Sequence, residues 1–209
     1  DGAKELFGCD HTVMPDRIAT VTYMAAAAVT GGNVTLQDVD NTHILPMLSP
    51  FEQAGCSVRQ LGRALNIMAP RRLNAVRHIR TMPYPGFPTD AQPVVMSMAA
   101  VGRGTSIFVE NIFESRYKHA EGLQRLGAKI KVEGKVAIVE GVDQLRGAPV
   151  TACDLRGGAA LVVAGLAAQG RTLVEGEEHI RRGYEDLAGS LADLGARIRE
   201  VEDSAGKME

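Results

Sequence analysis

The amino-acid sequence predicts a single α/β domain of three quasi-equivalent units around a threefold pseudo-axis. Two observations carry this prediction. Three segments of the chain repeat one order of helical and β-branched stretches, and an alanine-rich helix without a polar face recurs in each. The chain has 209 residues, 45% of them hydrophobic, which is enough to bury a core. The units span about residues 10–80, 81–150 and 151–203.

Each unit opens with a helix rich in small residues that a glycine ends. The three glycines are Gly32, Gly104 and Gly170, and a β-branched run follows each of them. Glycine adopts the left-handed backbone at little steric cost, which suits a switch from helix to strand. Each unit is therefore expected to begin with a helix followed by a strand.

A second helix is predicted in every unit, and it too ends at a glycine before a strand-like run. These glycines are Gly55, Gly127 and Gly195. The first two units are expected to add one more strand, at 64–68 and 136–139. The second helices carry charge on all but one face, whereas the alanine-rich helices do not. We therefore expect the alanine-rich helices at the centre, with the charged helices and the sheets around them.

Composition and patterning exclude several classes of protein. A net charge of −2 argues against a globally basic nucleic-acid binder, and no apolar run is long enough to span a membrane. No secretory signal is visible, so a cytoplasmic location is expected. The cysteines Cys9, Cys56 and Cys153 lie far apart without zinc spacing, which predicts reduced thiols and no bound metal.

The opening residues echo a later part of the chain. Residues 2–9, GAKELFGC, resemble residues 141–148, GVDQLRGA, which close the second unit and lead into the third. The chain thus opens like the tail of an earlier unit. We expect further sequence upstream and interpret the chain as the C-terminal portion of a larger protein.

Charged residues stand where the first helices begin. Asp16 and Thr89 are good N-cap residues, since their side-chain oxygens accept free backbone N–H groups. Capping does not explain Arg17 and Arg156, which place a cation in the first turn against the helix dipole. A bound anion at this end of the domain would explain both arginines.

Two more arginines follow the unit glycines at equal spacing. Arg116 lies as far beyond Gly104 as Arg182 lies beyond Gly170, and each is close to a tyrosine. If the units are equivalent, both belong to the end where helices start. A lone arginine is usually a solvated surface residue, but four on one face indicate a site for phosphate and carboxylate groups.

Asp90 follows a loop, PYPGFP at 83–88, that three prolines stiffen. A simple turn would not need a rigid backbone that leads to a carboxylate on the same face as the arginines. Asp90 could be a base or an orienting acceptor toward a substrate hydroxyl. Burial would raise its pKa and nearby arginines would lower it, and the sequence does not decide between them.

Several motifs in order resemble one family. They are PDRIAT with TYMAAAAVTGG, PYPGFPTDAQP, IFESRYKHAEGLQRLGA, DLRGGAALVVAGLAAQG and HIRRGYEDL. They resemble the UDP-N-acetylglucosamine enolpyruvyl transferases (1-carboxyvinyltransferases) of bacterial peptidoglycan synthesis, from about residue 2 to residue 201. In that family two domains, each of three such units, form inside-out α/β barrels with the active site between them. The resemblance implies that residues 1–209 form the C-terminal domain and that the N-terminal domain is absent from this chain.

The resemblance also implies a reaction. The family moves the enolpyruvyl group of phosphoenolpyruvate to the 3-hydroxyl of UDP-N-acetylglucosamine and releases phosphate, without a metal or organic cofactor. The catalytic residues it implies are Asp90, as the base at that hydroxyl, and Arg182, which binds phosphoenolpyruvate. The substrate-binding residues it implies are Arg17, Asp90, Ile112, Arg116, Asp154, Arg156 and Arg182. Arg116 and Arg156 belong to the phosphoenolpyruvate pocket, and the backbone at Ile112 helps to hold the nucleotide sugar.

The chain departs from the family in a few places. Ala19, Val21 and Ser115 stand where many relatives have an acidic residue, glycine and asparagine. The family's general acid is a cysteine or aspartate on a loop of the other domain, and none of the three cysteines here matches it. Without that domain we expect weak substrate binding and little or no turnover, and the exposed face could self-associate.

Two other functions stay open. A 3-phosphoshikimate enolpyruvyl transferase shares the fold and reaction, but PYPGFPTDAQP and DLRGGAALVVAG resemble the sugar-nucleotide branch more. A non-catalytic binding or scaffold domain of the same fold is the other alternative. Such a domain has no need of Asp90, Arg116, Arg156 and Arg182.

Overall fold

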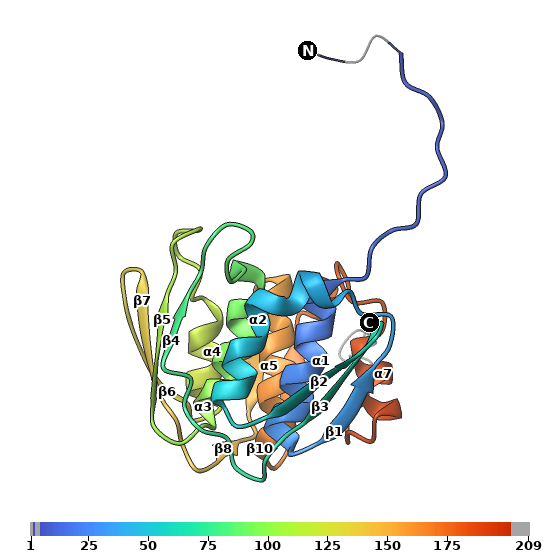
Figure 1. The fold of residues 1–209 in the computed structure, drawn as a ribbon. Coiled ribbons are helices and arrows are strands. Elements are labelled where there is room, and N and C mark those ends of the chain that lie inside the picture. Colours follow the sequence, from blue (N-terminus) through green and yellow to red (C-terminus); the bar gives the residue numbers. More distant parts are fainter. Residues whose placement is uncertain (1, 3–4, 202–209) are drawn as a thin grey trace, which may run out of the picture.

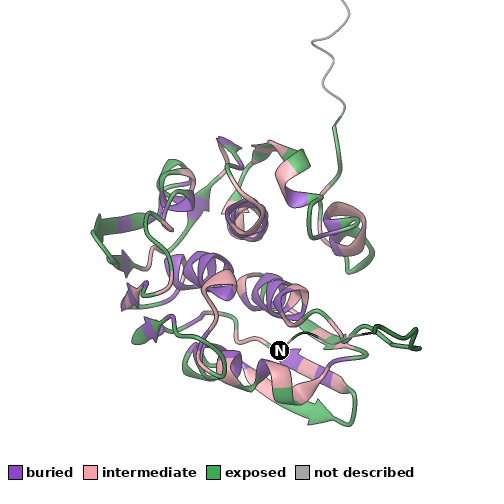
Figure 2. Ribbon diagram, turned by 90° about the horizontal axis from the view of Figure 1, so that it is seen from above, coloured by how far each residue is buried: buried purple, intermediate pink, exposed green. Residues whose placement is uncertain are grey.

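The computed structural model describes residue 2 and residues 5–201, and its core is a group of three helices. These helices, α1 (Arg17–Thr30), α3 (Gln92–Ala100) and α5 (Leu155–Ala167), pack against one another. Figure 2 shows them end-on as buried helices in the middle of the molecule. Every residue of α3 is buried, because its side chains face other elements all round. The small-residue helices therefore lie at the centre, as the sequence predicts.

The first part of the chain after α1 forms a three-stranded antiparallel sheet and one helix. The strands are β1 (Asn33–Leu36), β2 (Ser57–Leu61) and β3 (Ala64–Met68), in the order β1-β3-β2. Helix α2 (Asn41–Gln53) connects β1 to β2, and Asp40 caps its start by accepting a hydrogen bond from the backbone N–H of Thr42. Gly55 then adopts φ +94°, the left-handed backbone expected there.

The second part repeats this order and adds one strand. Four strands are ordered β4-β5-β7-β6: β4 (His78–Arg80), β5 (Thr105–Val109), β6 (Lys129–Glu133) and β7 (Val136–Glu140). Strand β4 pairs with β5 in parallel, and the other pairings are antiparallel. A short 3₁₀ helix, η1 (Thr89–Ala91), leads into α3, and α4 (His119–Arg125) precedes β6.

The third part contains short strands and short helices. Its strands are β8 (Leu145–Arg146), β9 (Pro149–Thr151), β10 (Ala168–Gln169) and β11 (Leu173–Glu175), and its outer helices are α6 (Glu177–Ile180) and α7 (Leu187–Asp193). Strand β8 pairs with β10 and β9 with β11, both in parallel. The fold thus mixes helices and strands throughout.

The strand predicted after Gly195 is wrong, because residues 196–201 form no strand. In the first two parts of the chain, the strand after the second helix pairs with a further strand, β2 with β3 and β6 with β7. The described part of the chain holds no such partner for residues 196–201, so their backbone has no ladder to join. The expected end of the third unit at residue 203, and residues 3–4 of the amino-terminal echo, lie outside the described residues.

A second correction concerns the end of α1. The left-handed residue there is Gly31, with φ +68°, and not Gly32. The N–H of Gly32 donates to the carbonyl of Ala27, so the two glycines together close the helix.

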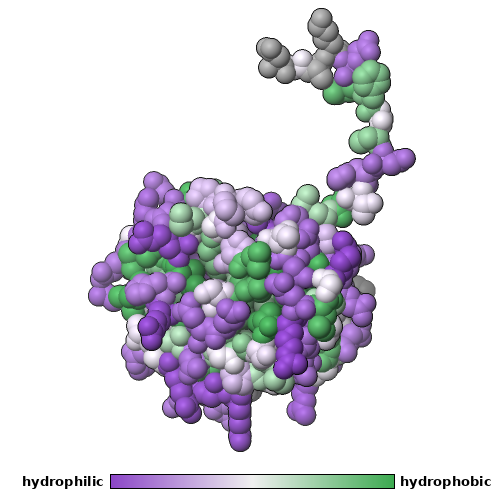
Figure 3. Space-filling view, viewed as in Figure 1, coloured by the Kyte–Doolittle hydropathy of each residue, from purple (hydrophilic) through white to green (hydrophobic). Residues whose placement is uncertain are grey.

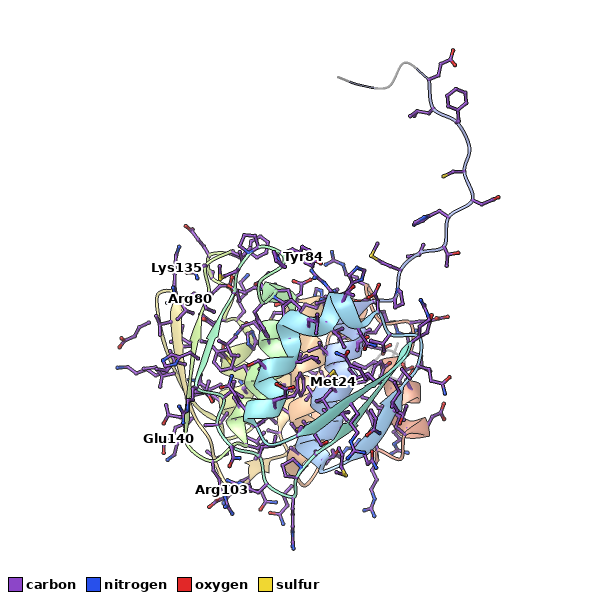
Figure 4. The ribbon with its side chains drawn as sticks, viewed as in Figure 1. Met24, Arg80, Tyr84, Arg103, Lys135 and Glu140 are labelled. Carbon is purple, nitrogen blue, oxygen red and sulfur yellow. The ribbon has the colours of Figure 1, made fainter. Side chains whose placement is uncertain are left out.

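The three inner helices start at the same end of the molecule. Figure 1 shows this end at the top, where the extended segment before α1 also leaves the body. In Figure 4, Tyr84 of the proline-rich loop lies at this end, and Arg103, which follows α3, lies at the opposite end. The first turns of α1 and α5, together with η1, therefore gather on one face. Among the described helices, none is both long and apolar enough to cross a bilayer.

Helix α4 approaches α5 closely through a glycine. A Cβ atom added at Gly122 would lie 2.6 Å from Cδ2 of Leu161, which is less than a normal contact. Leu161 is 1% exposed and fills the space that the missing side chain leaves. Substituting Leu161 therefore tests how much this contact stabilises the core.

We expect Leu161→Ala to lower the free energy of unfolding by about 2–5 kcal/mol, because it leaves a cavity between α4 and α5. The matched control is Leu45→Ala on α2, since Leu45 is 56% exposed and should change stability by less than about 0.5 kcal/mol. Urea denaturation followed by circular dichroism measures both. Equal losses in the two variants would contradict the assigned core.

Candidate active site

The site residues come from four segments that meet at the upper end of the molecule. Asp90 lies in η1, Arg116 in the turn before α4, Arg156 in the first turn of α5, and Tyr184 between α6 and α7. The parallel direction of α3 and α5 brings η1 beside the start of α5. Residues far apart in the sequence thus meet because the inner helices start together.

Asp90 lies between two arginines and binds both. Nη2 of Arg116 donates to Oδ1 of Asp90 at 2.9 Å, and Nε of Arg156 donates to Oδ2 at 3.3 Å. The side chain of Asp90 is 41% exposed, compared with 19% for Arg116 and 13% for Arg156. The carboxylate therefore faces solvent while two mostly buried cations lie behind it.

Arg156 also contacts a buried hydroxyl chain. Its Nη1 donates to the Tyr184 hydroxyl at 3.4 Å, and that hydroxyl lies 2.8 Å from Oγ1 of Thr22 on α1. Burial opposes the charge of Arg156, but Tyr184 and Asp90 raise its pKa above the ordinary value. Burial also raises the pKa of Tyr184. Arg156 is therefore a fixed cation that links α1, η1 and α5.

Asp154 caps α5 and contacts the arginine cluster as well. Its Oδ1 accepts hydrogen bonds from the backbone N–H groups of Arg156, at 3.0 Å, and Gly157, at 2.9 Å. The same oxygen lies 3.9 Å from Nη1 of Arg116. One carboxylate therefore offsets the dipole of α5 and the charge of Arg116.

Arg17 lies at the same end but away from Asp90. Its guanidinium carbon is 5.4 Å from the ring centroid of Tyr84, a cation–π distance. Asp16 caps α1, as predicted, by accepting hydrogen bonds from the N–H groups of Ile18 and Ala19. In the described chain, no ion pair joins Arg17 to an acidic side chain.

Arg182 is exposed on the turn after α6, and no described acidic residue pairs with it. The next residue, Gly183, packs on the start of α5. A Cβ atom there would lie 2.8 Å from Cδ2 of Leu155 and 3.6 Å from Nη1 of Arg156. The turn that carries Arg182 thus touches the site through Gly183.

Ile112 lies in a turn that a buried carboxylate organises. Its N–H donates to Oε1 of Glu110 at 2.8 Å, and the N–H of Phe113 donates to the same oxygen at 3.2 Å. Thr89, predicted as a cap of the second inner helix, donates instead to Oε2 of Glu110 at 2.9 Å. Its side chain makes no capping bond because the helix begins with a 3₁₀ turn after Pro88.

Ser115 has a left-handed backbone, with φ +54°. Asparagine, which the family resemblance in the sequence leads us to expect here, tolerates this conformation better than most residues. The departure from the family pattern therefore falls on a strained turn, one residue before Arg116.

Sequence reasoning did not single out Glu110, Thr22 or His119. Glu110 stands at the end of β5, where a polar residue gives no signal of burial. His119 is 4% exposed, and neither ring nitrogen has a hydrogen-bond partner within the described chain. Burial lowers the pKa of His119 to about 4; nearby Asp154 opposes this shift and Arg116 adds to it.

No cluster of three metal-ligating side chains occurs in the described ranges. All three cysteines are free thiols; Cys9 and Cys153 are exposed and Cys56 is buried. Burial raises the pKa of the Cys56 thiol to about 11, so it is a poor nucleophile.

A groove of about 1000 Å³ lies elsewhere, between β11, α6, α7 and residues 195–201. Of the residues in the arginine cluster it shares only Tyr184. The groove is thus separate from Asp90, whose own side chain is open to solvent. The face around Asp90 can bind an anionic group through two guanidinium forks and accept a proton at a carboxylate, provided that another surface covers it.

The family described as EPSP synthase (3-phosphoshikimate 1-carboxyvinyltransferase) matches residues 1–191. The chain belongs to this family. Within it, UDP-N-acetylglucosamine 1-carboxyvinyltransferase 2 of Caldanaerobacter subterraneus subsp. tengcongensis is 48% identical over 96% of the chain and 48% of that relative's length. The UDP-N-acetylglucosamine 1-carboxyvinyltransferase of Desulfofundulus thermocisternus is 48% identical over 95% of the chain and 82% of its own length.

These relatives confirm the resemblance found in the sequence motifs. Apart from the Desulfofundulus protein, the first relatives found are about twice as long as the matched region, so the chain spans about half their length. Among solved structures of enolpyruvyl transferases, NikO from Streptomyces tendae superposes with a TM-score of 0.81 at 30% identity, over 91% of this chain and 45% of NikO. EPSP synthase from Acinetobacter baumannii gives 0.71 at 20% identity, over 91% of this chain and 48% of its own, which supports the fold alone.

The depressed pKa of His119 predicts how stability depends on pH. Between pH 6.5 and 4 the unfolded chain binds a proton at His119 that the folded chain does not, so stability falls as pH drops through this interval. The loss in the free energy of unfolding approaches about 3 kcal/mol, and the contribution of neutral His119 is fully present above pH 6.5.

We expect His119→Leu to remove this part of the pH dependence, as measured by urea midpoints at pH 7, 6 and 5. The matched control is His78→Leu on β4, which removes an imidazole that is exposed and not buried. If wild type and His119→Leu lost stability in parallel, His119 would not be a buried neutral group.

Proposed function

We propose that this chain forms the C-terminal half of a UDP-N-acetylglucosamine 1-carboxyvinyltransferase, with UDP-N-acetylglucosamine and phosphoenolpyruvate as substrates. The reaction is the enolpyruvyl transfer of peptidoglycan synthesis. The observation that carries the proposal is the position of Asp90 between Arg116 and Arg156. It places a carboxylate and two anion-binding groups within one hydrogen-bond network, in a chain 48% identical to enzymes of that name. The proposal includes the cytoplasmic location expected from the sequence.

The proposed domain is an inside-out α/β barrel of three units, with the inner helices at its centre. The repeated order of helix, strand, helix, strand and strand in residues 17–68 and 92–140 supports this interpretation. The third unit would complete the barrel with a shorter set of elements. The N-terminal domain would be the other half of the enzyme.

In the proposed site, Asp90 is the base that receives the proton of the sugar 3-hydroxyl. Both of its oxygens bind arginines here, so the incoming hydroxyl shares or replaces one of these contacts. Arg116 and Arg156 would then be released toward the phosphate and carboxylate of phosphoenolpyruvate. Arg182 has no acidic partner in the described chain and is free to bind the same substrate.

Three further residues have supporting roles in this proposal. The backbone at Ile112 would hold the nucleotide sugar, and the hydrogen bond from its N–H to Glu110 fixes the position of this turn. Arg17, at the start of α1, and Asp154, at the start of α5, line the cleft between the two domains.

The chemistry suits these groups. The sugar oxygen bonds to C2 of phosphoenolpyruvate while C3 gains a proton; phosphate then leaves as C3 loses a proton, which restores the double bond. Charge develops around the tetrahedral intermediate, and fixed guanidinium groups stabilise it. The acid that protonates C3 would come from the other domain, as the family resemblance implies, and the buried thiol of Cys56 is not available for this role.

The upper face has the character of a surface that another domain covers. Met82, Tyr84 and Phe113 are large apolar side chains that are at least half exposed. Met82 and Tyr84 stand shortly before Asp90 in the sequence, and Phe113 stands shortly before Arg116. The segment before α1 adds Leu6 and Phe7, and Figure 3 shows it projecting from the body with apolar residues among polar ones. Without the other domain, this face could bind a second copy of the chain.

The family description and its shikimate substrate favour a second candidate, 3-phosphoshikimate enolpyruvyl transfer. The deciding experiment measures phosphate release from phosphoenolpyruvate by the full-length protein that contains this chain. We expect turnover with UDP-N-acetylglucosamine and none with shikimate 3-phosphate. We also expect Asp90→Asn to lower kcat about 10²–10⁴-fold, because the base is lost while its size is kept.

Turnover only with shikimate 3-phosphate would reverse the choice of substrate. Unchanged kcat in Asp90→Asn would remove Asp90 from catalysis. Substrate binding without any turnover would favour the binding or scaffold domain.

Two adjacent arginines offer a matched test of phosphoenolpyruvate binding. We expect Arg182→Ala to raise the KM for phosphoenolpyruvate about tenfold or more, because a charge-assisted contact is lost. Arg181 binds Glu177 and Glu200 instead, so Arg181→Ala should leave that KM within about twofold. Initial rates at varied phosphoenolpyruvate measure both. A larger effect at Arg181 would exclude Arg182 from the site.

A further inference from the structure

Glu110 is a buried carboxylate that four hydrogen bonds surround. It is 1% exposed and follows β5 directly. Its Oε1 accepts from Oγ1 of Thr81 at 2.8 Å and from the N–H groups of Ile112 and Phe113, and its Oε2 accepts from Oγ1 of Thr89 at 2.9 Å. Within the described chain no cation pairs with it. Hydrogen-bond donors alone therefore stabilise this carboxylate.

These contacts join two of the four segments that supply the candidate active site, η1 and the turn before α4. Thr89 immediately precedes Asp90, and the turn at Ile112 leads to Arg116. Thr81 adds a second link, because its Oγ1 accepts from the N–H of Asn111 at 2.9 Å. Glu110 thus holds the end of the proline-rich loop and the turn before α4 in one fixed arrangement.

Stability alone does not explain why a carboxylate is buried in this network. A buried carboxylate loses its hydration, and apolar side chains of similar volume often stabilise a core as well or better. Burial raises the pKa of Tyr117, and the nearby charge of Glu110 raises it further, so the carboxylate acts on its surroundings. Three of its four hydrogen bonds lead to Thr89, Ile112 and Phe113, in the segments that carry Asp90 and Arg116.

We propose that Glu110 is a positioning residue for the acceptor substrate, which it serves by fixing the backbone at Thr89–Asp90 and at Ile112–Phe113. The inference rests on the proposed function, in which Asp90 and Ile112 contact the nucleotide sugar. Glu110 itself touches no substrate. In the proposed function, phosphoenolpyruvate binding depends on Arg116, Arg156 and Arg182. Glu110 contacts none of these three, and its bonds to the turn end at Phe113, three residues before Arg116.

The first test is Glu110→Gln in the full-length protein. Glutamine keeps the size of the side chain but replaces one acceptor oxygen with a donor, so at least one of the four bonds loses its acceptor. We expect the KM for UDP-N-acetylglucosamine to rise about tenfold, with the KM for phosphoenolpyruvate within about twofold. Thr89→Val should reproduce this split and Thr89→Ser should rescue it, because serine keeps the hydroxyl.

The matched control is Ser106→Ala on the same strand. Ser106 is fully buried, and its Oγ accepts from the N–H of Val76 at 3.0 Å, far from the site. It should lower stability without separating the two KM values. Equal changes in both KM values for Glu110→Gln and Thr89→Val, or a KM split in Ser106→Ala, would overturn the positioning role.

A second measurement is independent of the reaction. In NMR spectra of this chain, Glu110→Gln should shift the amide resonances of Asp90, Ile112 and Phe113 but leave Arg156 in place. If the wild-type protein turned over neither acceptor, the proposed function would fail, and these shifts would still decide whether Glu110 links the two segments. Unchanged resonances at Asp90 would overturn the proposal even in an active enzyme.

Discussion

The arrangement of the upper face depends on one carboxylate shared by two guanidinium groups. Arg116 and Arg156 are both mostly buried and carry like charges, so they can lie together only if an anion lies between them. Asp90 supplies that anion and joins η1, the turn before α4 and the start of α5. In the free chain the cluster is thus electrostatically satisfied. In the proposed function, an anionic substrate would exchange with Asp90 for the same guanidinium donors, which would couple phosphoenolpyruvate binding to release of the Asp90 carboxylate.

Much of the fold could be predicted from local sequence. The glycines that end the second helices, Gly55, Gly127 and Gly195, all have the left-handed backbone expected of them, because this requirement is local. The central position of the small-residue helices followed from their lack of a polar face. The strand expected at 196–201 failed for a non-local reason, since a strand requires a partner that the pattern of a single segment does not reveal.

The site residues follow the same distinction, since some had a local signal in the sequence and others did not. Equal spacing along the repeats singled out Arg116, a cation in the first turn of a helix singled out Arg156, and the stiff loop singled out Asp90. These signals lie in short stretches of sequence. Glu110 and His119 gave no signal, since their importance comes from burial by segments far away in the chain. A charged residue at the end of a strand is most often solvated, and only the three-dimensional structure distinguishes the exception.

The contact between Gly122 and Leu161 has a consequence for how such domains evolve. The two positions share one volume between α4 and α5, so a larger residue at 122 fits only if residue 161 becomes smaller. Either change made first leaves a clash or a void, and the intermediate sequence is less stable than both endpoints. Homologous sequences should therefore show the two positions changing as a pair, whereas Glu121 and Arg125, on the solvent side of α4, can drift singly.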